Sequence, residues 1–253
     1  MRLHPFHVSA EFFVHPVLTP YSVVSYLHVK HVLEAVREAV PFLHGRLLDM
    51  GCGRKPYRSV LRCASHIGVD VSTSPNFNHA IDCIYDGAHL PFGDASFDSV
   101  LCTEVLEHCS EPWAFMKEVS RVLKPGGHAL ITVPFVIHHH EEPFDFTRFT
   151  RYGLIEVVTR SGMSPVWVRS RGAEYATAIA LVYLAVSYTV SRRPIIDAVL
   201  WLLWPLAMAT LALDGWRRKD PCISLGWQML TRKAGTVLVQ SADGGLTAPA
   251  NAV

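Results

Sequence analysis

The chain has 253 residues, of which 50% are hydrophobic and 18% charged, and its formal net charge is +1. This length suits one α/β domain with additions, or at most two small domains. The near-zero charge argues against a nucleic-acid binder that acts by neutralising phosphates. The six cysteines form no CxxC pair and no disulfide-like pattern, which indicates a reducing cytoplasm. The first residues lack the apolar core and cleavage site of a signal peptide.

Residues 1–44 are expected to be an N-terminal helical segment. Residues 1–20 are rich in His, Pro and aromatic residues without a clear period, whereas residues 22–40 carry apolar side chains near helical spacing. Pro41 is expected to end this helix, and Gly45 begins the approach to the first strand.

Strands and helices alternate in residues 45–172, the predicted core. Apolar and β-branched runs predict strands at 46–51, 66–72, 80–87, 97–105, 128–135 and 164–171. Helical spacing predicts helices at 57–64, 112–123 and 151–162, and the sequence KPGG after the second of these supplies the glycine expected beyond a helix C-terminus. This alternation implies βαβ units and a parallel sheet with helices on both faces.

Acidic residues gather where these strands end. Asp49, Asp70, Asp86 and Glu104 all fall at or just after a predicted strand end. In open α/β sheets, ligands bind outside the carboxyl ends of the strands. Acids that only solvate loops would be scattered along the chain, so their placement predicts a ligand site at this edge.

The loop Gly51-Cys52-Gly53-Arg54-Lys55-Pro56 allows close backbone approach to a ligand at both glycines. Alone it fits either a nucleotide-type ligand or a plain tight turn. A dinucleotide fingerprint has a third glycine for close helix–strand packing. Pro56 stands at that position, where it suits the first turn of a helix. The loop therefore disfavours NAD, and an acid-lined edge suits a cationic sulfonium better than a pyrophosphate.

Four stretches follow in one order: DMGCG, GVDVS, YDGAHLPFGDASFDSVLCTEVLEH and EVSRVLKPGG. Together they resemble the class I methyltransferases that use S-adenosylmethionine (SAM), and in particular the type 11 group. The resemblance covers roughly residues 43–172 and a late strand near 227–233. It implies an α/β fold with a Rossmann-like seven-stranded methyltransferase sheet whose last strand runs antiparallel. Residues 224–233 alternate well enough to be that strand.

The resemblance also implies SAM as cofactor and assigns its contacts by position. Asp49, Gly51 and Gly53 look like the motif that holds the methionyl part of SAM. Asp70 looks like the acid that accepts hydrogen bonds from both ribose hydroxyls, which a carboxylate can do at once.

Asp86 and Gly87 look like the adenine-binding turn, and Glu104 lies where the family faces the methyl donor. The chain departs from the family where Arg54, Lys55 and Pro56 replace the usual glycine-rich extension.

The acceptor side is expected to come from residues 134–154, after the fifth core strand. Methyl transfer needs alignment of the nucleophile, and a base as well if the acceptor is a hydroxyl. We expect His140 and Asp145 to be the polar acceptor-side pair, with His108 as a second candidate base. The residues expected to bind substrate are Phe135, Glu141 and Arg148.

Plainer interpretations of this region stay open. The 134–154 segment can be a solvated loop, His108 can pack against a helix, and Asp145 with Arg148 can be an ion pair that braces the loop. No metal site is predicted, because the side chains of neighbouring residues such as His138 and His139 point apart, whereas metal ligands converge on one point.

An apolar helical hairpin is predicted at 173–219, inserted before the last strand. Residues 175–190 and 198–213 carry no charge, and each run is shorter than the roughly 20 residues of a confident membrane span. Basic residues stand at the turn and at the exit, and aromatic residues suited to membrane interfaces lie along both runs: Arg192, Arg193, Arg217, Arg218, Lys219, Trp201, Trp204, Trp216, Tyr175, Tyr183 and Tyr188.

Three interpretations of the hairpin stay open. It can dip into one leaflet, it can form a homodimer interface or a lid over an apolar substrate, or it can cross the membrane twice, which Pro205 does not exclude. In the first two cases the acceptor is expected to be lipid-linked or amphipathic. The last core strand is expected within 220–239, and the polar residues 240–253 are expected to be disordered.

The sequence thus predicts a SAM-dependent methyltransferase that acts on a hydroxyl or amine of a small or lipid-linked acceptor. It predicts no nucleic-acid partner, and a cytoplasmic location at the inner face of a membrane if the hairpin inserts. A non-catalytic SAM-fold module that binds a membrane or partner is the first alternative. An NAD-linked oxidoreductase is the second, disfavoured by Pro56.

Overall fold

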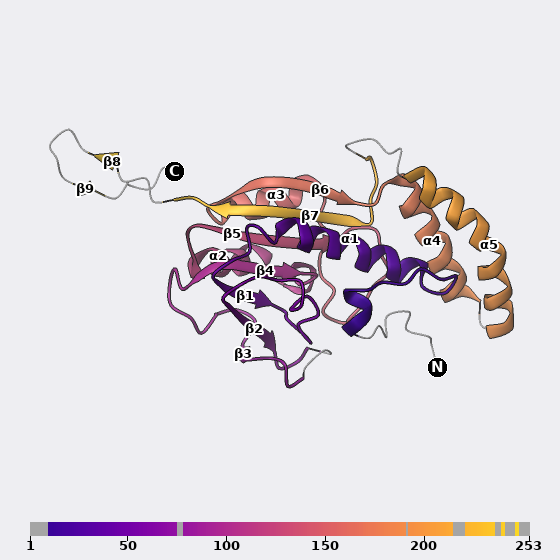
Figure 1. Ribbon diagram of the computed structural model, residues 1–253, viewed down its shortest axis with the longest axis horizontal. Coiled ribbons are helices and arrows are strands. Elements are labelled where there is room, and N and C mark those ends of the chain that lie inside the picture. Colours follow the sequence, from indigo (N-terminus) through magenta and orange to yellow (C-terminus); the bar gives the residue numbers. More distant parts are fainter. Residues whose placement is uncertain are drawn as a thin grey trace.

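The computed structural model describes residues 10–74, 78–190, 192–214, 221–235, 239–240 and 246–247. Seven strands form one mixed sheet in the order β3-β2-β1-β4-β5-β7-β6 (Figure 1). The first five pair in parallel, and β7 runs antiparallel between β5 and β6. This is the seven-stranded Rossmann-like arrangement that the sequence predicts. The bounds are β1 Arg46–Met50, β2 Ser65–Val71, β3 Cys83–Tyr85, β4 Phe97–Thr103, β5 Leu123–Pro134, β6 Met163–Arg171 and β7 Gly226–Lys233.

Helices cover both faces of the sheet. Leu47 and Leu48 are neighbours in β1 and point to opposite faces, as strand geometry requires. Leu47 packs in a cluster with α1 (Val23–Ala39), whereas Leu48 packs in a cluster with α2 (Pro112–Val122) and α3 (Arg151–Arg160). Because both faces are buried, the central strands are continuous apolar runs rather than alternating ones.

Two local predictions are wrong. Residues 57–64 fold as turns instead of the predicted helix, since eight residues nucleate a helix poorly in water. Tyr57 nevertheless packs in the cluster beneath α1. The sequence KPGG does not form a turn after a helix, because α2 ends at Val122 and β5 begins at Leu123, so Gly126 lies inside the strand segment with a φ of 81°.

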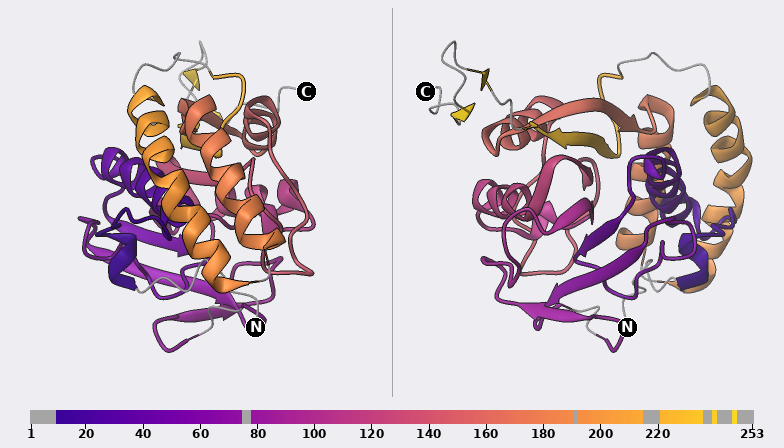
Figure 2. Two further views of the ribbon diagram at one scale, coloured as in Figure 1. Left: turned by 90° about the vertical axis from the view of Figure 1, so that its right-hand side faces the viewer. Right: turned by 60° about the vertical axis from the view of Figure 1, so that its left-hand side comes forward.

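The apolar hairpin consists of α4 (Glu174–Thr189) and α5 (Arg193–Asp214), which lie side by side at one end of the molecule (Figure 2). α4 packs against the first half of α1 through a cluster that includes Leu27, Ala180 and Tyr183. Tyr183 is therefore buried and is not one of the surface aromatics that the sequence suggested. Trp216 and the basic residues expected at the exit lie outside the described residues.

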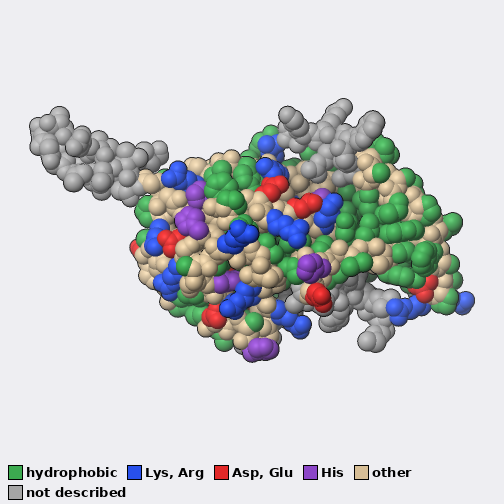
Figure 3. Space-filling model, viewed as in Figure 1, with side chains coloured by type: hydrophobic (Ala, Val, Ile, Leu, Met, Phe, Trp, Pro, Cys, Tyr) green, Lys and Arg blue, Asp and Glu red, His purple; other side chains and the backbone are tan. Residues whose placement is uncertain are grey.

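The outer side of the hairpin is apolar. Leu202 and Leu206 on α5 are 79% and 53% exposed, and Figure 3 shows hydrophobic side chains gathered over this end of the molecule. Within the described residues, Arg193–Leu213 is the one helix long and apolar enough to cross a membrane, with a mean hydropathy of 1.9. Short chain segments also pair beyond β7, as β8 (Val239–Gln240) and β9 (Leu246–Thr247); the rest of the expected disordered tail lies outside the described residues.

Candidate functional site

The loop after β1 comes close to the loop after β4. Gly51 has a φ of 60°, and a Cβ there would lie 2.4 Å from Cγ2 of Val105, so only glycine fits this position. Gly53, with a φ of 46°, donates its backbone N–H to Oδ2 of Asp70 at 3.1 Å. The two glycines therefore bring the β1 loop, the end of β2 and the end of β4 together, as the cofactor prediction requires.

Asp70 is buried and already orders the backbone around it. Its Oδ1 accepts the N–H of Val71 at 2.8 Å while its Oδ2 accepts the N–H of Gly53. Each carboxylate oxygen can accept more than one hydrogen bond. Asp70 can therefore accept further hydrogen bonds, as the predicted contact with the ribose hydroxyls requires.

Asp49 is turned into the protein rather than toward the loop. It is buried, and its Oδ2 lies 2.8 Å from Nε2 of His66. Burial raises the pKa of Asp49, against the opposing effect of the His66 hydrogen bond. Its carboxylate supports β1 from behind, so only its backbone can take part in the predicted methionyl contact.

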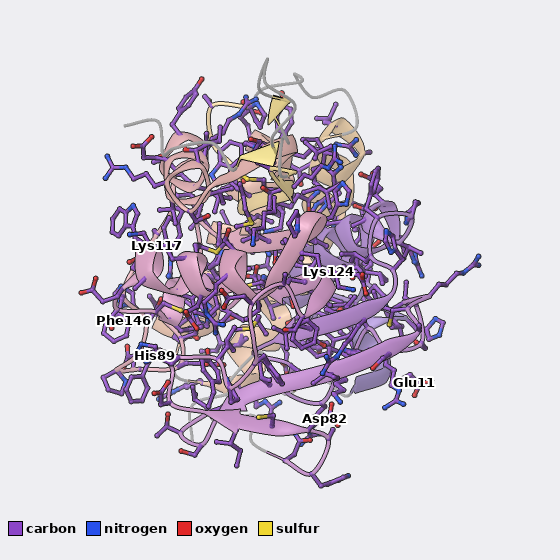
Figure 4. All side chains as sticks on the ribbon, turned by 90° about the vertical axis from the view of Figure 1, so that its left-hand side faces the viewer. Glu11, Asp82, His89, Lys117, Lys124 and Phe146 are labelled. Carbon is purple, nitrogen blue, oxygen red and sulfur yellow. The ribbon has the colours of Figure 1, made fainter. Side chains whose placement is uncertain are left out.

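Lys55, one of the residues at which this loop departs from the family pattern, has a structural partner. Its ammonium group is buried and pairs with Oδ2 of Asp82, which also accepts the N–H of Gly68 at 2.7 Å. Asp82 lies directly before β3, at the edge of the sheet in Figure 4. The lysine that replaces glycine therefore ties the β1 loop to β2 and β3 rather than projecting toward a ligand.

Asp86 is an exposed side chain that caps its own turn. Its Oδ1 accepts the backbone N–H groups of Ala88 at 2.8 Å and His89 at 2.7 Å, which lower the pKa of the Asp86 carboxyl. Gly87 follows with a φ of 87°. Asp86 and Gly87 thus form a tight turn, and Oδ2 of Asp86 makes the longer contact with Nδ1 of His89, at 3.7 Å.

Glu104 lies at the centre of a buried ion-pair group. Its carboxylate is 3.0 Å from Nη1 of Arg171 and accepts from Nη2 at 3.1 Å, and it accepts the hydroxyl of Thr132 at 2.7 Å. Nε2 of His28, on α1, lies 3.5 Å away. Burial would raise the pKa of Glu104, but the charges of Arg171 and His28 and the hydrogen bonds from Thr132 and Arg171 together outweigh it and hold the pKa below its usual value.

Several residues expected on the acceptor side lie close together. The loop after β5 is fixed to the 3-10 helix η2 (Leu106–His108), because the carbonyl of Glu107 accepts the N–H groups of Phe146 at 2.9 Å and Thr147 at 3.2 Å. Phe146 itself lies at the surface, where Figure 4 labels it. The rings of His108 and His140 meet edge to face with centroids 4.8 Å apart.

Asp145 and Arg148 support His140 from behind. Arg148 binds both carboxylate oxygens of Asp145, with Nη2 to Oδ2 at 2.6 Å. Oδ2 of Asp145 accepts the backbone N–H of His140 at 3.0 Å and lies 3.5 Å from its Nδ1. Burial opposes ionisation of Asp145, but the Arg148 hydrogen bond holds its pKa at about 2.

Glu107 is the group in this cluster that the sequence did not single out. Its side chain is fully buried, and Oε1 lies 3.6 Å from Nε2 of His108 and 3.8 Å from Nε2 of His140. Both distances are longer than a hydrogen bond. Burial raises the pKa of the Glu107 carboxyl. Its position directly before His108 in the run EVLEHC was the available signal, but the sequence does not show that this carboxylate turns inward.

An apolar pocket of about 570 Å³ adjoins this polar cluster. Phe135, a predicted substrate contact, lines it together with Leu181, Leu184 and Tyr188 of α4. The His138 ring lies 5.3 Å from the ring of Tyr188 and 6.2 Å from that of His140. The hairpin thus forms one wall of a pocket, and the opposite wall runs from Phe135 to His138, next to His140.

Comparisons with known proteins agree with this geometry. Residues 48–131 match the family model described as a methyltransferase domain. The chain is similar to a malonyl-[acyl-carrier protein] O-methyltransferase of Erwinia pyrifoliae, with 34% identity over 95 residues, which are 34% of this chain and 36% of that protein. It is also similar to a 27-O-demethylrifamycin SV methyltransferase of Amycolatopsis mediterranei, with 33% identity over 98 residues, 32% of this chain and 36% of that protein.

The fold is similar to that of a SAM dependent methyltransferase from Archaeoglobus fulgidus, with a TM-score of 0.51 and 15% identity over 80% of this chain and 94% of that chain. The match to the two curated relatives spans little more than a third of their length. The family-model match at residues 48–131 contains the loop after β1 and the ends of β2 and β4, and it ends before the acceptor loop and the hairpin.

Proposed function

We propose that the chain is a SAM-dependent methyltransferase that transfers a methyl group from SAM to a hydroxyl or amine of a small or lipid-linked acceptor. The match of residues 48–131 to a methyltransferase domain and the similar fold support this proposal. The observation that carries this proposal is the meeting of two groups at one edge of the sheet. Gly51, in the loop proposed to hold SAM with Gly53 and Asp70, lies against Val105. The carbonyl of Val105 accepts the N–H of His108 at 2.9 Å, and the ring of His108 meets that of His140.

The residues at the strand ends fit SAM as a cofactor. Gly51 leaves no space for a side chain, the backbone at Gly53 is adjacent to the Asp70 carboxylate, and the acids favour a cationic sulfonium. SAM supplies a methyl group that its sulfonium already activates. The chain's own residues then have to hold SAM and align the acceptor, and alignment alone supplies about 7–11 kcal/mol in the best intramolecular cases.

The acceptor is proposed to be apolar over part of its length. The pocket between the acceptor loop and α4 is lined mostly by apolar side chains and ends near His138 and His140. An apolar chain in this pocket would present its polar end to the cluster. His108, His140 and Asp145 would orient that end, with Arg148 holding Asp145 in place.

The hairpin is proposed to rest on the cytoplasmic face of a membrane. Its exposed apolar side chains on α5 and the exposed pair Arg192 and Arg193 at the turn support a surface contact with anionic lipid. A lipid-linked acceptor would then enter the pocket beside α4 from the bilayer. A homodimer built on the same surface is the alternative.

Calorimetry with SAM, S-adenosylhomocysteine and NAD tests the cofactor. Binding of SAM and S-adenosylhomocysteine without NAD is expected, and binding of NAD alone would overturn the proposal in favour of an oxidoreductase. Mass spectrometry of host lipids and glycans, with and without the protein, then tests turnover. A protein that binds SAM yet changes no host compound by one methyl group would be the non-catalytic module.

A further inference from the structure

The geometry of the polar cluster points to a metal site: we infer that Glu107, His108 and His140 bind one Zn²⁺ ion. One oxygen or ring nitrogen from each residue lies within 4.8 Å of the others. The three come from η2 and from the loop after β5, so the fold rather than local sequence brings them together. Adjacent histidines do point apart, as the sequence argument against a metal assumed, but only His140 of the 138–140 run takes part.

The spacing suits a tetrahedral ion. Bonds of about 2.0–2.1 Å from Zn²⁺ to nitrogen and oxygen set neighbouring ligand atoms about 3.3–3.4 Å apart. Oε1 of Glu107 lies 3.6 Å from Nε2 of His108 and 3.8 Å from Nε2 of His140. These separations are too long for hydrogen bonds and slightly longer than the ligand spacing, and the third pair of ligand atoms lies within 4.8 Å, so rotation of the side chains toward one another would complete the site.

Both imidazoles are held in the orientation that metal binding needs. Nδ1 of His108 lies 2.8 Å from the carbonyl oxygen of Phe144. Nδ1 of His140 lies 3.4 Å from the carbonyl oxygen of His138 and 3.5 Å from Oδ2 of Asp145, which Arg148 fixes. An acceptor at Nδ1 keeps the proton there and leaves the Nε2 lone pair for a metal, which is the outer arrangement found around metal-ligating histidines.

Glu107 is the independent observation. Its side chain is 0% exposed, and neither carboxylate oxygen has a hydrogen-bond partner among the residues that the structure describes. Burying a carboxylate without a partner costs several kcal/mol, and buried charges are therefore paired or bound to metals. The groups that can carry opposite charge are the two imidazoles, at 3.6 and 3.8 Å, and a divalent cation between them and Glu107 supplies a permanent counter-charge.

Two imidazoles and one carboxylate are a ligand set of catalytic zinc sites, which keep a fourth position for a substrate or water. Oε2 of Glu141 lies 3.8 Å from Nε2 of His108, at the border of this position. The role of the ion rests on the proposed function: it would bind the oxygen of a hydroxyl acceptor and lower its pKa, so that the proton leaves to solvent. That oxygen then forms the bond to the methyl carbon as the carbon–sulfur bond breaks, and sulfur keeps the electron pair.

The test measures Zn²⁺ binding directly on the full chain. Protein stripped with a chelator is titrated with Zn²⁺ against a chromophoric competitor, and bound metal is counted by atomic absorption. Wild type should bind one ion per chain. His140→Ala and Glu107→Gln should lose affinity by at least the roughly 10–100-fold that removal of an outer-shell partner costs.

His139→Ala is the matched control, because it removes an exposed histidine from the same run without touching the cluster. It should bind Zn²⁺ like wild type. Zn²⁺ should also raise the melting temperature of wild type and His139→Ala but not of Glu107→Gln. Replacement of Zn²⁺ by Co²⁺ should give visible absorption bands that His140→Ala lacks.

Wild type without stoichiometric Zn²⁺, or equal losses in His139→Ala and His140→Ala, would overturn the inference. Should Glu107→Gln fail to fold, the comparison of the two histidine variants decides alone. SAM calorimetry on the metal-free protein separates this inference from the proposed function. A protein that binds Zn²⁺ but not SAM would contradict the methyltransferase proposal and still support the metal site.

Discussion

Replacing Glu104 by glutamine is expected to destabilise the protein strongly, because it leaves the charge of Arg171 without its partner. Arg171 is 1% exposed, and both of its terminal nitrogens lie within 3.1 Å of the Glu104 carboxylate. Breaking a buried ion pair from one side costs about 3–5 kcal/mol. The Glu104 side chain is 17% exposed, so the lower end, about 3 kcal/mol in the free energy of unfolding, is expected.

A double variant separates the effect of losing the ion pair from the effect of leaving the charge of Arg171 buried without a partner. Glu104→Gln combined with Arg171→Met removes both charges and keeps an unbranched apolar side chain in place of the arginine stem. It should recover most of the lost stability, since apolar replacement of a buried pair is often neutral or stabilising. Thr132→Val removes one hydrogen bond to Glu104 and should cost only about 1 kcal/mol. Urea unfolding measures all three.

Acid should erase the difference between wild type and Glu104→Gln. The folded pKa of Glu104 lies below the ordinary value of 4.5, so its contribution to stability is complete above that pH and is lost as the pH falls through the folded pKa. The difference in free energy of unfolding between wild type and Glu104→Gln should thus be constant from about pH 6 to 8 and shrink below about pH 4.5. A single variant within about 1 kcal/mol of wild type at pH 7, or a double variant worse than the single one, would refute the reasoning.

The remaining predictions concern the two halves of the site. Asp70→Ala should weaken SAM binding by about 1.5–3 kcal/mol, the range for hydrogen bonds to a charged group. Asp86→Ala should weaken SAM binding less, because Asp86 is exposed and its carboxylate already binds the backbone of its own turn. Calorimetry that ranks the two variants in the reverse order would contradict the ribose assignment. Asp145→Asn should lower turnover by about tenfold or more with SAM affinity unchanged, because it weakens the support of His140 outside the cofactor loop; a parallel loss of SAM affinity would place Asp145 in the scaffold of the cofactor site.

The sheet could be predicted from the sequence because its strands are short apolar runs that end in acids or glycines. Leu47, Leu48 and their neighbours on β4 and β5 are buried whichever face they point to, so the apolar pattern survives without knowledge of the register. The missed feature at 57–64 shows the limit. Tyr57 contributes to the core there without a helix, because tertiary packing and not local propensity decides the conformation of eight residues.

The site could be predicted only as far as it depends on strand ends. His108, His140, Asp145 and Arg148 lie after β4 and β5, which are neighbours in the sheet, so their convergence follows from the topology. The direction of a side chain does not follow from the topology. Glu107 turns inward between the imidazoles of His108 and His140, whereas Glu104, three residues earlier, turns to Arg171. The sequence did not indicate a role for Arg171.

The surface of the hairpin provides the last prediction, because it decides between a membrane and a second copy of the chain. Leu202→Glu with Leu206→Glu places charges on the exposed side of α5 without touching the cluster that packs against α1. Full burial of one leucine side chain in an apolar phase is worth about 1.5–3 kcal/mol. If the membrane buries part of each side chain, losing both leucines should cost about 3 kcal/mol, or roughly 100-fold in partition onto vesicles. Co-sedimentation with anionic vesicles measures it, since Arg192 and Arg193 flank the surface.

Ile84→Glu is the control, because Ile84 is 53% exposed on β3 at the opposite edge of the sheet from the hairpin side. It should leave vesicle binding unchanged, and all variants should unfold in urea at the same midpoint as wild type, since only exposed side chains change. A wild-type protein that ignores vesicles and runs as a dimer, which the α5 variant converts to a monomer, would make this surface a contact between two copies. The acceptor pocket beside α4 would then open at a protein interface, and the argument for a lipid-linked acceptor would lose its support.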